Sequence, residues 1–389
     1  MTERFEYAVV GLGALGSATA WQLARRGASV VGLERFALSH ERGASHDSSR
    51  ILRHSYHTQD YVRLTFEAYD DWTTLEADTG ERFVTVTGGI DLFPPGCAIP
   101  PDDYTASMAA CAVPYSVLDR AEVAERWPQI TLPEGTLAIH QERTGIVPAA
   151  RGTTAMQREA TARGAVLRGE SAVTAVRDLG TAGLEVDAGG QTYRVRRLVV
   201  TADAWTNDVV GHLGAHVPLT VTQEQVTYFT PARPADFAPE AFPVWIWMDD
   251  PSFYGFPTYG EATVKAAQDC GGPPVTGDDR SFEPDADRQR LLADFMAQTF
   301  PASGPPTRSK TCLYTLTPDR DFVLGALPGH ESVAVGLGAA HGFKFAPTFG
   351  RLLADLATTG EAGTAVDLTQ FRLDRPALTD PDYVGSWLV

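Results

Sequence analysis

The sequence contains few cysteines, no long apolar run and no excess of basic residues. No apolar run approaches the roughly 18 residues that a membrane-spanning helix needs, so we expect no membrane partner. The 32 Lys and Arg against 49 Asp and Glu give a net charge of −17, which argues against nucleic acid as a partner. The four cysteines are far apart and form no Cys/His cluster, so no metal site is expected.

Further features of the sequence limit the class of protein. No basic and apolar signal segment precedes the first predicted strand, which indicates a cytoplasmic protein with free thiols by default. Hydrophobic residues make up 43% of the chain and charged residues 21%, as in globular proteins. A chain of 389 residues has room for about two or three domains.

The N-terminal segment has the pattern strand, glycine turn, helix, strand, acid. Gly11, Gly13 and Gly16 form a GxGxxG motif that follows the apolar run 7–10. Such glycines permit a tight turn, close approach of a pyrophosphate and packing of the helix on the strand. Glu34 lies at the end of the second apolar run, where an acid can hold a ribose hydroxyl. We therefore predict a dinucleotide site; the motif alone does not distinguish FAD from NAD, and a glycine-rich turn in an unrelated sheet is the alternative.

The remaining pattern predicts an α/β fold with an α+β second domain. The strand–helix alternation returns at residues 198–213, so the middle of the chain is expected to rejoin the first domain. We predict a Rossmann-type domain from residues 1–80, 145–215 and 315–389. Residues 81–144 and 216–314 should form a substrate domain on a mainly antiparallel sheet, because they contain aromatic and β-branched runs. Helices are predicted at 17–26, 61–75, 149–163, 285–299 and 347–358, and a proline-rich loop at 94–103.

Two sets of cations have unusual surroundings. Arg50 and Arg53 are three residues apart, which on a helix or tight turn places both on one side. Solvent-exposed arginines are the alternative, although Ile51 and Leu52 lie between them. Lys265 stands in the apolar strand pattern 263–267, where a lysine is costly unless it is paired or functional.

Several separated motifs together resemble the monomeric sarcosine oxidase family of flavoenzymes, which includes N-methyltryptophan oxidase and pipecolate oxidase and belongs to the D-amino-acid-oxidase-like superfamily. The resemblance runs over nearly the whole chain. It implies FAD rather than NAD, a covalent thioether to the flavin from Cys312, and a monomer. The motifs are the Gly11–Gly16 fingerprint, Ser45-His46 through Arg50 to Arg53-His54, Tyr254-Gly255-Phe256-Pro257, Lys265, Cys312-Leu313-Tyr314-Thr315 and His341-Gly342-Phe343-Lys344-Phe345.

The resemblance also implies roles for individual residues. Arg53 and Lys344 match the clamp for the substrate carboxylate, while Lys265 matches the oxygen-activating lysine and Arg50 a second cation beside the flavin ring. The substrate pocket is expected to include Tyr254, Tyr314, Trp245 and His341. The expected cofactor-binding residues are Gly11, Gly13, Ala14, Leu15, Gly16, Glu34, Arg35, Ser45, Ser49, Arg50, Val173, Cys312, Gly338, Gly342, Phe343 and Lys344.

The chain departs from the family pattern at three positions. Asp269 stands where sarcosine oxidases have a histidine, Trp245 where they have a smaller methionine, and Asp203 where they have a glycine. A carboxylate at 269 can accept from a substrate N–H or act as a base. The alternative is that Asp269 faces solvent in the loop before Cys270. The first two departures make sarcosine a doubtful substrate.

These observations predict an FAD-dependent oxidase of an N-substituted or cyclic amino acid. Its small-molecule partners would be the amino or imino acid and O2, and its products an imine and hydrogen peroxide. A flavin dehydrogenase that uses an electron carrier is a second possibility. A flavoprotein that binds a carboxylated ligand without turnover is a third.

Overall fold

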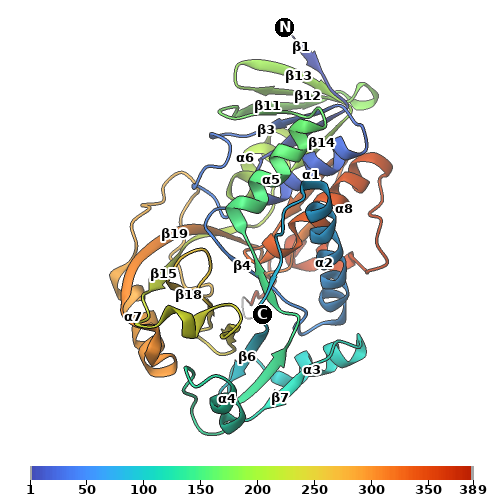
Figure 1. Cartoon of the computed structure of the whole chain (residues 1–389). Coiled ribbons are helices and arrows are strands. Elements are labelled where there is room, and N and C mark those ends of the chain that lie inside the picture. The colour runs from blue at the N-terminus through green and yellow to red at the C-terminus, as the bar shows by residue number, and fades with distance from the viewer. Residues whose placement is uncertain (1, 387–389) are drawn as a thin grey trace.

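A computed structural model describes residues 2–386 of the chain (Figure 1). It is a mixed α/β protein with one six-stranded and one eight-stranded sheet, and two smaller ones, which confirms the predicted fold class. In Figure 1 the six-stranded sheet lies in the upper half of the molecule and the eight-stranded sheet in the lower half.

The six-stranded sheet contains the strand that precedes the glycine turn and is parallel except for its last strand. Its central strands are buried almost throughout, as expected for a parallel sheet that is covered on both faces. In order across the sheet the strands are β10 (Val166–Arg168), β3 (Val30–Leu33), β2 (Tyr7–Val10), β14 (Arg197–Val200), β21 (His330–Leu337) and β20 (Val323–Leu327).

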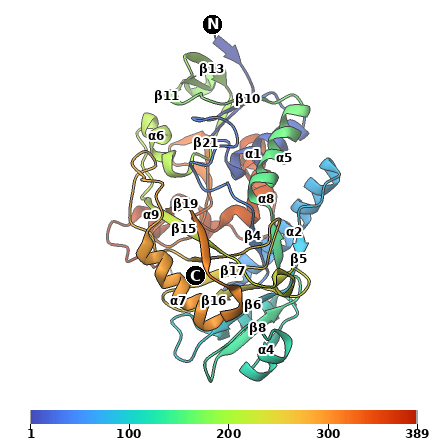
Figure 2. The ribbon, with the colours of Figure 1, turned by 60° about the vertical axis from the view of Figure 1, so that its left-hand side comes forward.

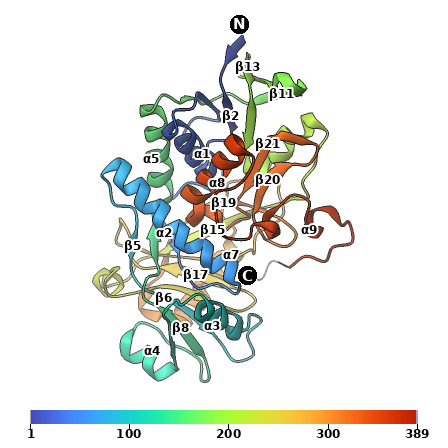
Figure 3. The same ribbon diagram turned by 90° about the vertical axis from the view of Figure 1, so that its right-hand side faces the viewer.

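Helix α1 (Ala14–Arg25) packs between α5 (Ala149–Ala162) and α8 (Ala346–Thr359) (Figure 3). The backbones of α1 and α8 approach closely, because a Cβ atom added at Gly350 would lie 2.4 Å from the Cβ of Ala18. The N-terminal motif is therefore packed against a helix near the C-terminus.

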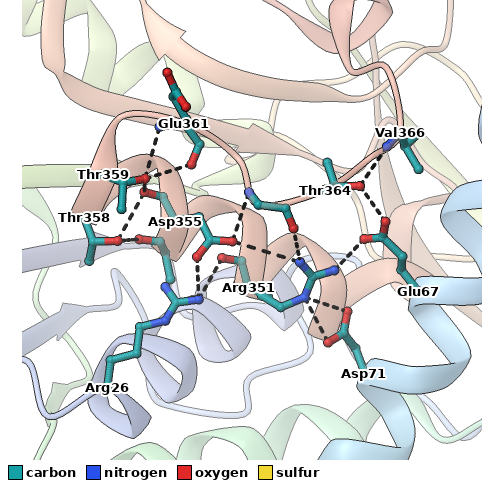
Figure 4. Close-up of polar contacts among 12 residues, drawn as sticks. Arg26, Glu67, Asp71, Arg351, Asp355, Thr358, Thr359, Glu361, Thr364 and Val366 are labelled. Carbon is teal, nitrogen blue, oxygen red and sulfur yellow. Dashed lines mark hydrogen bonds and ion pairs between the residues drawn. The ribbon is translucent and has the colours of Figure 1, made fainter.

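Ion pairs connect α8 to neighbouring helices (Figure 4). The Arg351 guanidinium on α8 lies 3.1 Å from Asp71 and 2.5 Å from Glu67, both on α2 (Gln59–Thr79). Arg26, directly after α1, lies 2.8 Å from Asp355 on α8. Three helices that are distant in sequence are thus tied together at one place.

The eight-stranded sheet is antiparallel apart from one pair, β16 with β6, as the aromatic and β-branched runs predicted. Helix α7 (Ala286–Thr299) packs on one face through Leu292 and Met296 (Figure 2). In order the strands are β19 (Pro306–Leu316), β15 (Thr220–Phe229), β18 (Val264–Gln268), β17 (Phe253–Phe256), β16 (Val244–Trp247), β6 (Gly89–Phe93), β8 (Leu137–Gln141) and β7 (Ser116–Leu118).

Two small sheets and several short helices make up the rest. The first sheet has the order β1 (Thr2–Arg4), β13 (Gln191–Val195), β12 (Leu184–Ala188), β11 (Val173–Asp178), and the second β4 (Arg50–Leu52), β9 (Gly145–Val147), β5 (Thr85–Val86). The short α-helices are α4 (Arg120–Arg126), α6 (Thr206–Val210) and α9 (Pro376–Thr379). The predicted domain boundaries stay predictions.

The five predicted helices are present as α1, α2, α5, α7 and α8, but the predicted proline-rich loop at 94–103 is partly wrong. Helix α3 (Pro101–Ala110) begins inside it, with Pro101 in the first turn. Proline is tolerated there because that N–H has no partner within the helix in any case. Among residues 2–386, no helix is both long and apolar enough to cross a membrane.

Candidate active site

Two adjoining cavities lie at the carboxyl ends of the parallel strands β2, β3, β14 and β21. The glycine-loop cavity is lined by Gly11, Glu34 and their neighbours, and the lysine cavity by Lys265, Lys344 and theirs. This edge of an open parallel sheet is where ligands commonly bind. The residues that line both cavities are Gly13, Ala44, Ser45, His46, Thr201 and Asp203.

The glycine turn has the geometry that the motif predicts. Gly11 has a φ of +86°, and a Cβ atom there would lie 2.6 Å from the carbonyl oxygen of Thr201. A Cβ atom at Gly16 would lie 1.8 Å from the carbonyl oxygen of Gly11. The backbone N–H of Ala14, the first residue of α1, donates to Ser45 Oγ at 2.8 Å. Neither glycine can be replaced without moving the backbone.

Glu34 is buried and holds the turn together. Its carboxylate accepts from the backbone N–H of Leu12 at 2.8 Å and of Phe36 at 3.0 Å, and His40 lies 3.2 Å away. Burial alone would raise the pKa of Glu34, but the contacts to His40, Phe36 and Leu12 lower it. The carboxylate therefore stays ionised at the edge of the glycine-loop cavity.

The other predicted cofactor residues lie along the two cavities. Arg35 lines the glycine-loop cavity and lies 2.9 Å from Asp278 and 3.2 Å from Asp208. Val173 lines the same cavity. Leu15, Ser49, Gly338, Gly342 and Phe343 line the lysine cavity.

The residues at the junction fit an elongated dinucleotide such as FAD. His46 lines both cavities, is 6% exposed, and has no hydrogen-bond partner at either ring nitrogen among residues 2–386. Burial, reinforced by Arg50, lowers the pKa of His46 to about 4, so the ring is neutral. A buried, unpartnered imidazole facing a glycine-lined cavity is suited to a polar ligand that runs through both.

Asp203 also lies at the junction, in the strained backbone region with a φ of 48°. Glycine adopts this conformation without cost, which explains the glycine that the family has at this position. Burial raises the pKa of Asp203 to about 6, and a hydrogen bond with Thr315 acts in the opposite direction. The aspartate in place of glycine at position 203 therefore places a carboxyl group beside both cavities.

One face of the eight-stranded sheet forms a wall of the lysine cavity. Lys310, Cys312 and Tyr314 alternate along β19 and all face it, because side chains two apart on a strand share a face. Tyr254 on β17 faces it too, and its hydroxyl lies 3.3 Å from that of Tyr314. The sheet thus brings together the two predicted tyrosines and the predicted cysteine.

Trp245 does not line the cavity, contrary to the expectation from sequence. It is 1% exposed, lies on the opposite face of β16 and stacks on Phe300 with ring centroids 4.2 Å apart. The facing residue Gly255 leaves room for the ring, since a Cβ atom there would lie 2.4 Å from the indole. Ile246, the next residue along β16, lines the cavity instead.

Cys312 is buried in this wall. Burial raises the pKa of its thiol to about 11, while Arg50 acts in the opposite direction. The thiol is therefore protonated in this environment. All four cysteines of the chain are free, and of these Cys312 alone lines either cavity within the described residues.

Lys265 projects from β18 into the same cavity and is 4% exposed. Its ammonium donates to Asp47 Oδ2 at 3.1 Å and to the carbonyl of Ser49 at 2.9 Å, and lies 4.5 Å from the centre of the Phe256 ring. Burial lowers the pKa of Lys265 to about 8, Asp47 opposes this shift, and Arg50 adds to it.

Arg50 and Arg53 both line the lysine cavity, but not on the helix or tight turn that their spacing suggested. Arg50 begins strand β4, and Arg53 directly follows its end. The Arg50 guanidinium donates to the carbonyls of Ala44, His46 and Ser49 at 2.7–2.9 Å. Within residues 2–386 it forms no ion pair with a carboxylate.

Arg53 is paired with a carboxylate that the sequence analysis missed. Its guanidinium lies 3.2 Å from Asp91 Oδ1 on β6, and both side chains are buried. Ser55 also donates to Asp91. Burial raises the pKa of Asp91, and Arg53 acts in the opposite direction. A lone acid within the apolar run 89–93 is the sequence signal for such a buried partner.

Asp269 lines the cavity, so the alternative of a solvent-facing loop is wrong. Its carboxylate lies 2.7 Å from the guanidinium of Arg320, which also lines the cavity and is 4% exposed. Arg320 was not anticipated, because a single arginine in a loop gives no local sequence signal. The orientation of the Asp269 carboxylate is therefore fixed by a buried cation.

Lys344 lies in the short helical turn Gly342–Phe345 that precedes α8, and His341 comes directly before that turn. Both residues line the lysine cavity. The Lys344 ammonium donates to the carbonyl of His341 at 2.6 Å. Burial, together with the charges of Arg53 and Arg320, holds the pKa of Lys344 well below its usual range. The charge of Asp269 acts in the opposite direction, but within residues 2–386 Lys344 has no carboxylate within ion-pair distance.

Comparisons with known proteins agree with these motifs. Residues 6–356 match the model of a family described as "FAD dependent oxidoreductase". The chain is 32% identical to monomeric sarcosine oxidase of Streptomyces avermitilis over 380 residues, which cover 95% of this chain and 97% of the relative. It is 30% identical to human peroxisomal sarcosine oxidase, with 94% and 95% covered.

A solved structure has the same fold at similar identity. NikD, described as an unusual amino acid oxidase essential for nikkomycin biosynthesis, superposes with a TM-score of 0.85 at 29% identity. The match covers 95% of this chain and 98% of that one. The similarity to these oxidases extends over nearly the whole chain.

Proposed function

Because the chain belongs to the FAD-dependent oxidoreductase family and is an FAD-dependent amine oxidase, we propose that it oxidises an N-substituted or cyclic amino acid and passes the electrons to O2. The products would be an imine and hydrogen peroxide. Bound flavin supplies the ring that accepts a hydride equivalent from the carbon next to nitrogen. The protein must hold that carbon, bind the carboxylate and stabilise charge on oxygen.

The unpaired charge of Lys344 is the observation that carries this proposal. The other substrate-side cations, Arg53 and Arg320, each have a carboxylate partner, whereas Lys344 has none among residues 2–386. An incoming carboxylate would give Lys344 a partner and would restore its charged form. Arg53, close by, supplies a fork of N–H donors that can orient the same carboxylate.

Asp269 supports a secondary amine as the reacting group. Its carboxylate is held by Arg320 and lines the cavity that also contains Lys344, so one ligand can meet both charges. An ionised carboxylate can accept from an N–H and can take its proton before oxidation. The walls formed by Ile246, Tyr254 and Tyr314 are apolar or aromatic, which suits a ring or an N-alkyl group.

The cations on the other side of the cavity support O2 as the acceptor. Lys265 and Arg50 both line it near Cys312, and positive charge there stabilises the anion that forms when O2 takes up an electron. An electron-carrier protein would not require a buried lysine at this position. We therefore favour an oxidase over a dehydrogenase.

We also propose that Cys312 holds the flavin through a thioether. The supporting observation is the position of its thiol in the cavity wall beside Arg50. Acid precipitation should leave a yellow, fluorescent pellet, and Cys312→Ser should release the colour to the supernatant. A wild-type pellet without flavin would remove Cys312 as the attachment site. The cytoplasmic location and monomeric state remain predictions.

One experiment tests the activity directly. The purified enzyme is mixed anaerobically with proline, pipecolate, N-methyl amino acids and sarcosine, and flavin bleaching is followed; air is then admitted and peroxide measured. We expect bleaching by a cyclic or N-alkyl amino acid, and peroxide on oxygenation. Bleaching without peroxide would favour the dehydrogenase, and no bleaching by any candidate would favour a non-catalytic flavoprotein. Faster bleaching by an amine without a carboxylate would contradict the assignment of Lys344.

A further inference from the structure

We infer that Asp47 is a positioning residue for Lys265, which keeps the Lys265 ammonium charged and aimed into the cavity for the reaction with O2. This inference rests on the proposed oxidase function. In this proposal the Lys265 ammonium itself stabilises the charge that forms on oxygen, whereas Asp47 acts through Lys265.

The side chain of Asp47 contacts Lys265 and two further groups that hold it in place. One carboxylate oxygen accepts from Lys265 Nζ at 3.1 Å, and the other accepts from the hydroxyl of Tyr228 on β15. The side chains of Lys265 and Asp47 are 4% and 7% exposed, so solvent does not compete for the contact. Lys310 on β19 lies 3.8 Å from the same carboxylate.

The backbone at Asp47 is held in an unfavourable conformation. Its φ is 76°, a region that non-glycine residues seldom occupy, although aspartate tolerates it better than most. The backbone N–H of Ala150, on α5, donates to the carbonyl of Asp47 at 3.0 Å. Contacts from α5, β15 and β18 together hold this conformation, which brings the carboxylate to Lys265. Strain of this kind is frequently found at functional sites.

The chemistry requires the charge that Asp47 preserves. O2 takes up two electrons from the reduced flavin and two protons to become hydrogen peroxide, and the one-electron stage on oxygen is the superoxide anion. An ammonium beside that anion stabilises it, whereas a neutral amine gives almost no stabilisation. Burial favours the neutral amine, so Lys265 needs a nearby anion to remain protonated.

The charged and titratable groups around the pair come from three elements and one loop. The loop before β4 contributes His46 and Asp47, and β4 contributes Arg50; β15 contributes Tyr228, and β19 contributes Lys310 and Cys312. Arg50 lowers the pKa of Lys265, and Asp47 raises it. Asp47 is the carboxylate in ion-pair contact with Lys265 among the described residues.

The test measures reoxidation without any amino acid substrate. The enzyme is reduced anaerobically with dithionite and mixed with O2 between pH 6 and 10. Lys265 is charged below its pKa, so the wild-type rate should fall as the pH rises through about 8. Asp47→Asn removes the group that raises this pKa, and the fall should move down by about one to three pH units. Asp47→Glu should restore most of the shift, and Lys265→Met should abolish the step.

A second readout needs no turnover. The absorption of oxidised bound flavin is titrated over the same range, and the part of the change that Lys265→Met removes reports the charge of Lys265. That component should shift down in Asp47→Asn, in parallel with the rate. Glu261→Gln is the matched control, because it removes a carboxylate at the surface, 2.5 Å from Arg308, just before β18, and should shift neither midpoint.

The outcomes separate this inference from the proposed function. Unshifted midpoints in Asp47→Asn, or a shift equal to that of Glu261→Gln, would overturn the role of Asp47. If reduced wild-type enzyme does not react with O2, the oxidase proposal fails, and the absorption titration still decides whether Asp47 controls the charge of Lys265.

Discussion

The two cavities are built in different ways. The glycine-loop cavity depends largely on residues 7–45, which are close in sequence, and its polar contacts are mainly to the backbone. The lysine cavity is assembled from segments near residues 50, 246, 265, 312 and 342, and its contacts are mainly between charged side chains. A motif can therefore encode the first, whereas the second exists only once distant strands have paired.

The two cavities also differ in how their charged side chains are paired. In the lysine cavity, Lys265, Arg53 and Arg320 each form an ion pair with a carboxylate, and Lys344 forms none within residues 2–386. Buried charges are costly unless they are paired, so an unpaired one indicates where a ligand contributes the partner. The first cavity therefore presents mainly backbone to a ligand, whereas the second presents charged side chains, among them Lys344 and Arg50 without a carboxylate at ion-pair distance in residues 2–386.

The largest effect should follow from disturbing the glycine turn. Gly16→Val adds atoms where even a Cβ lies 1.8 Å from the carbonyl of Gly11, so α1 cannot pack and the phosphate-binding turn is lost. The purified variant should contain no flavin, as measured by the ratio of absorbance at 450 and 280 nm. Gly211→Ala is the control, because Gly211 has a helical backbone with a φ of −60° and a Cβ atom there meets no atom within 4 Å. Normal flavin content in Gly16→Val would contradict the assignment of the turn.

Next in size are Lys344 and Arg53, the two cations proposed to bind the substrate carboxylate, which should behave differently from each other. Lys344→Met and Arg53→Met each remove charge-assisted bonds of about 1.5–3 kcal/mol, so KM should rise by a factor of about 10 to 150. Arg53→Met also leaves Asp91 buried without its cation, at a cost of about 3–5 kcal/mol.

Kinetics and thermal melting on both variants test this contrast. The melting temperature should fall clearly in Arg53→Met and little in Lys344→Met. Arg63→Met is the control, because Arg63 is half-exposed and its partners Asp60 and Gln59 lie in the same helix. Equal melting temperatures for the two clamp variants would show that Asp91 does not depend on Arg53.

The effect of pH on the binding of a carboxylate should be similar in size to the KM changes of the Lys344 and Arg53 variants, or smaller. Lys344 has a lowered pKa when no anion is bound, and a bound carboxylate raises it, so binding takes up a proton above the lowered value. The Kd for cyclopentanecarboxylate should therefore rise with pH by up to about tenfold per unit. Perturbation of the flavin spectrum measures it. A Kd independent of pH would mean that Lys344 does not titrate, and Lys344→Met should give that result.

The smallest expected effect concerns Asp269. Asp269→Asn keeps the shape but removes the charge that faces Arg320, and kcat/KM should fall about tenfold if one charge-assisted contact with the substrate is lost. Flavin content should not change. Asp287→Asn, at an exposed position on α7, is the matched control. Unchanged kcat/KM in Asp269→Asn would place the selectivity of the cavity elsewhere.

The sequence supported much of the fold and the cation set of the site. Strands β2 and β3, the long helices and the mainly antiparallel second sheet follow from periodicity and turn residues, and matches to known oxidases confirm the resemblance. Lys265 was identified because an apolar strand rarely carries a lysine. These features are local, so a single segment contains the information.

The partners of those cations could not be predicted in the same way. Each of these partners contacts its cation or carboxylate from far away in the sequence. The separation is 218 residues for Asp47 and Lys265, 38 for Asp91 and Arg53, and 51 for Arg320 and Asp269. Trp245 was placed on the wrong face because side chains on a strand alternate, and the sequence does not indicate which face of β16 meets the cavity. Charge pairing and strand facing depend on the whole fold.

The strand order of the six-stranded sheet determines when this protein can acquire its cofactor. β2 lies between β3 and β14, and β14 lies between β2 and β21, which ends at Leu337. At about 5–20 residues per second, the ribosome needs on the order of tens of seconds to synthesise β21 after the glycine turn has emerged. During that interval the sheet that supports the turn is incomplete, because β14 lacks its neighbour β21. We therefore expect flavin capture to be a late step in the biogenesis of this protein.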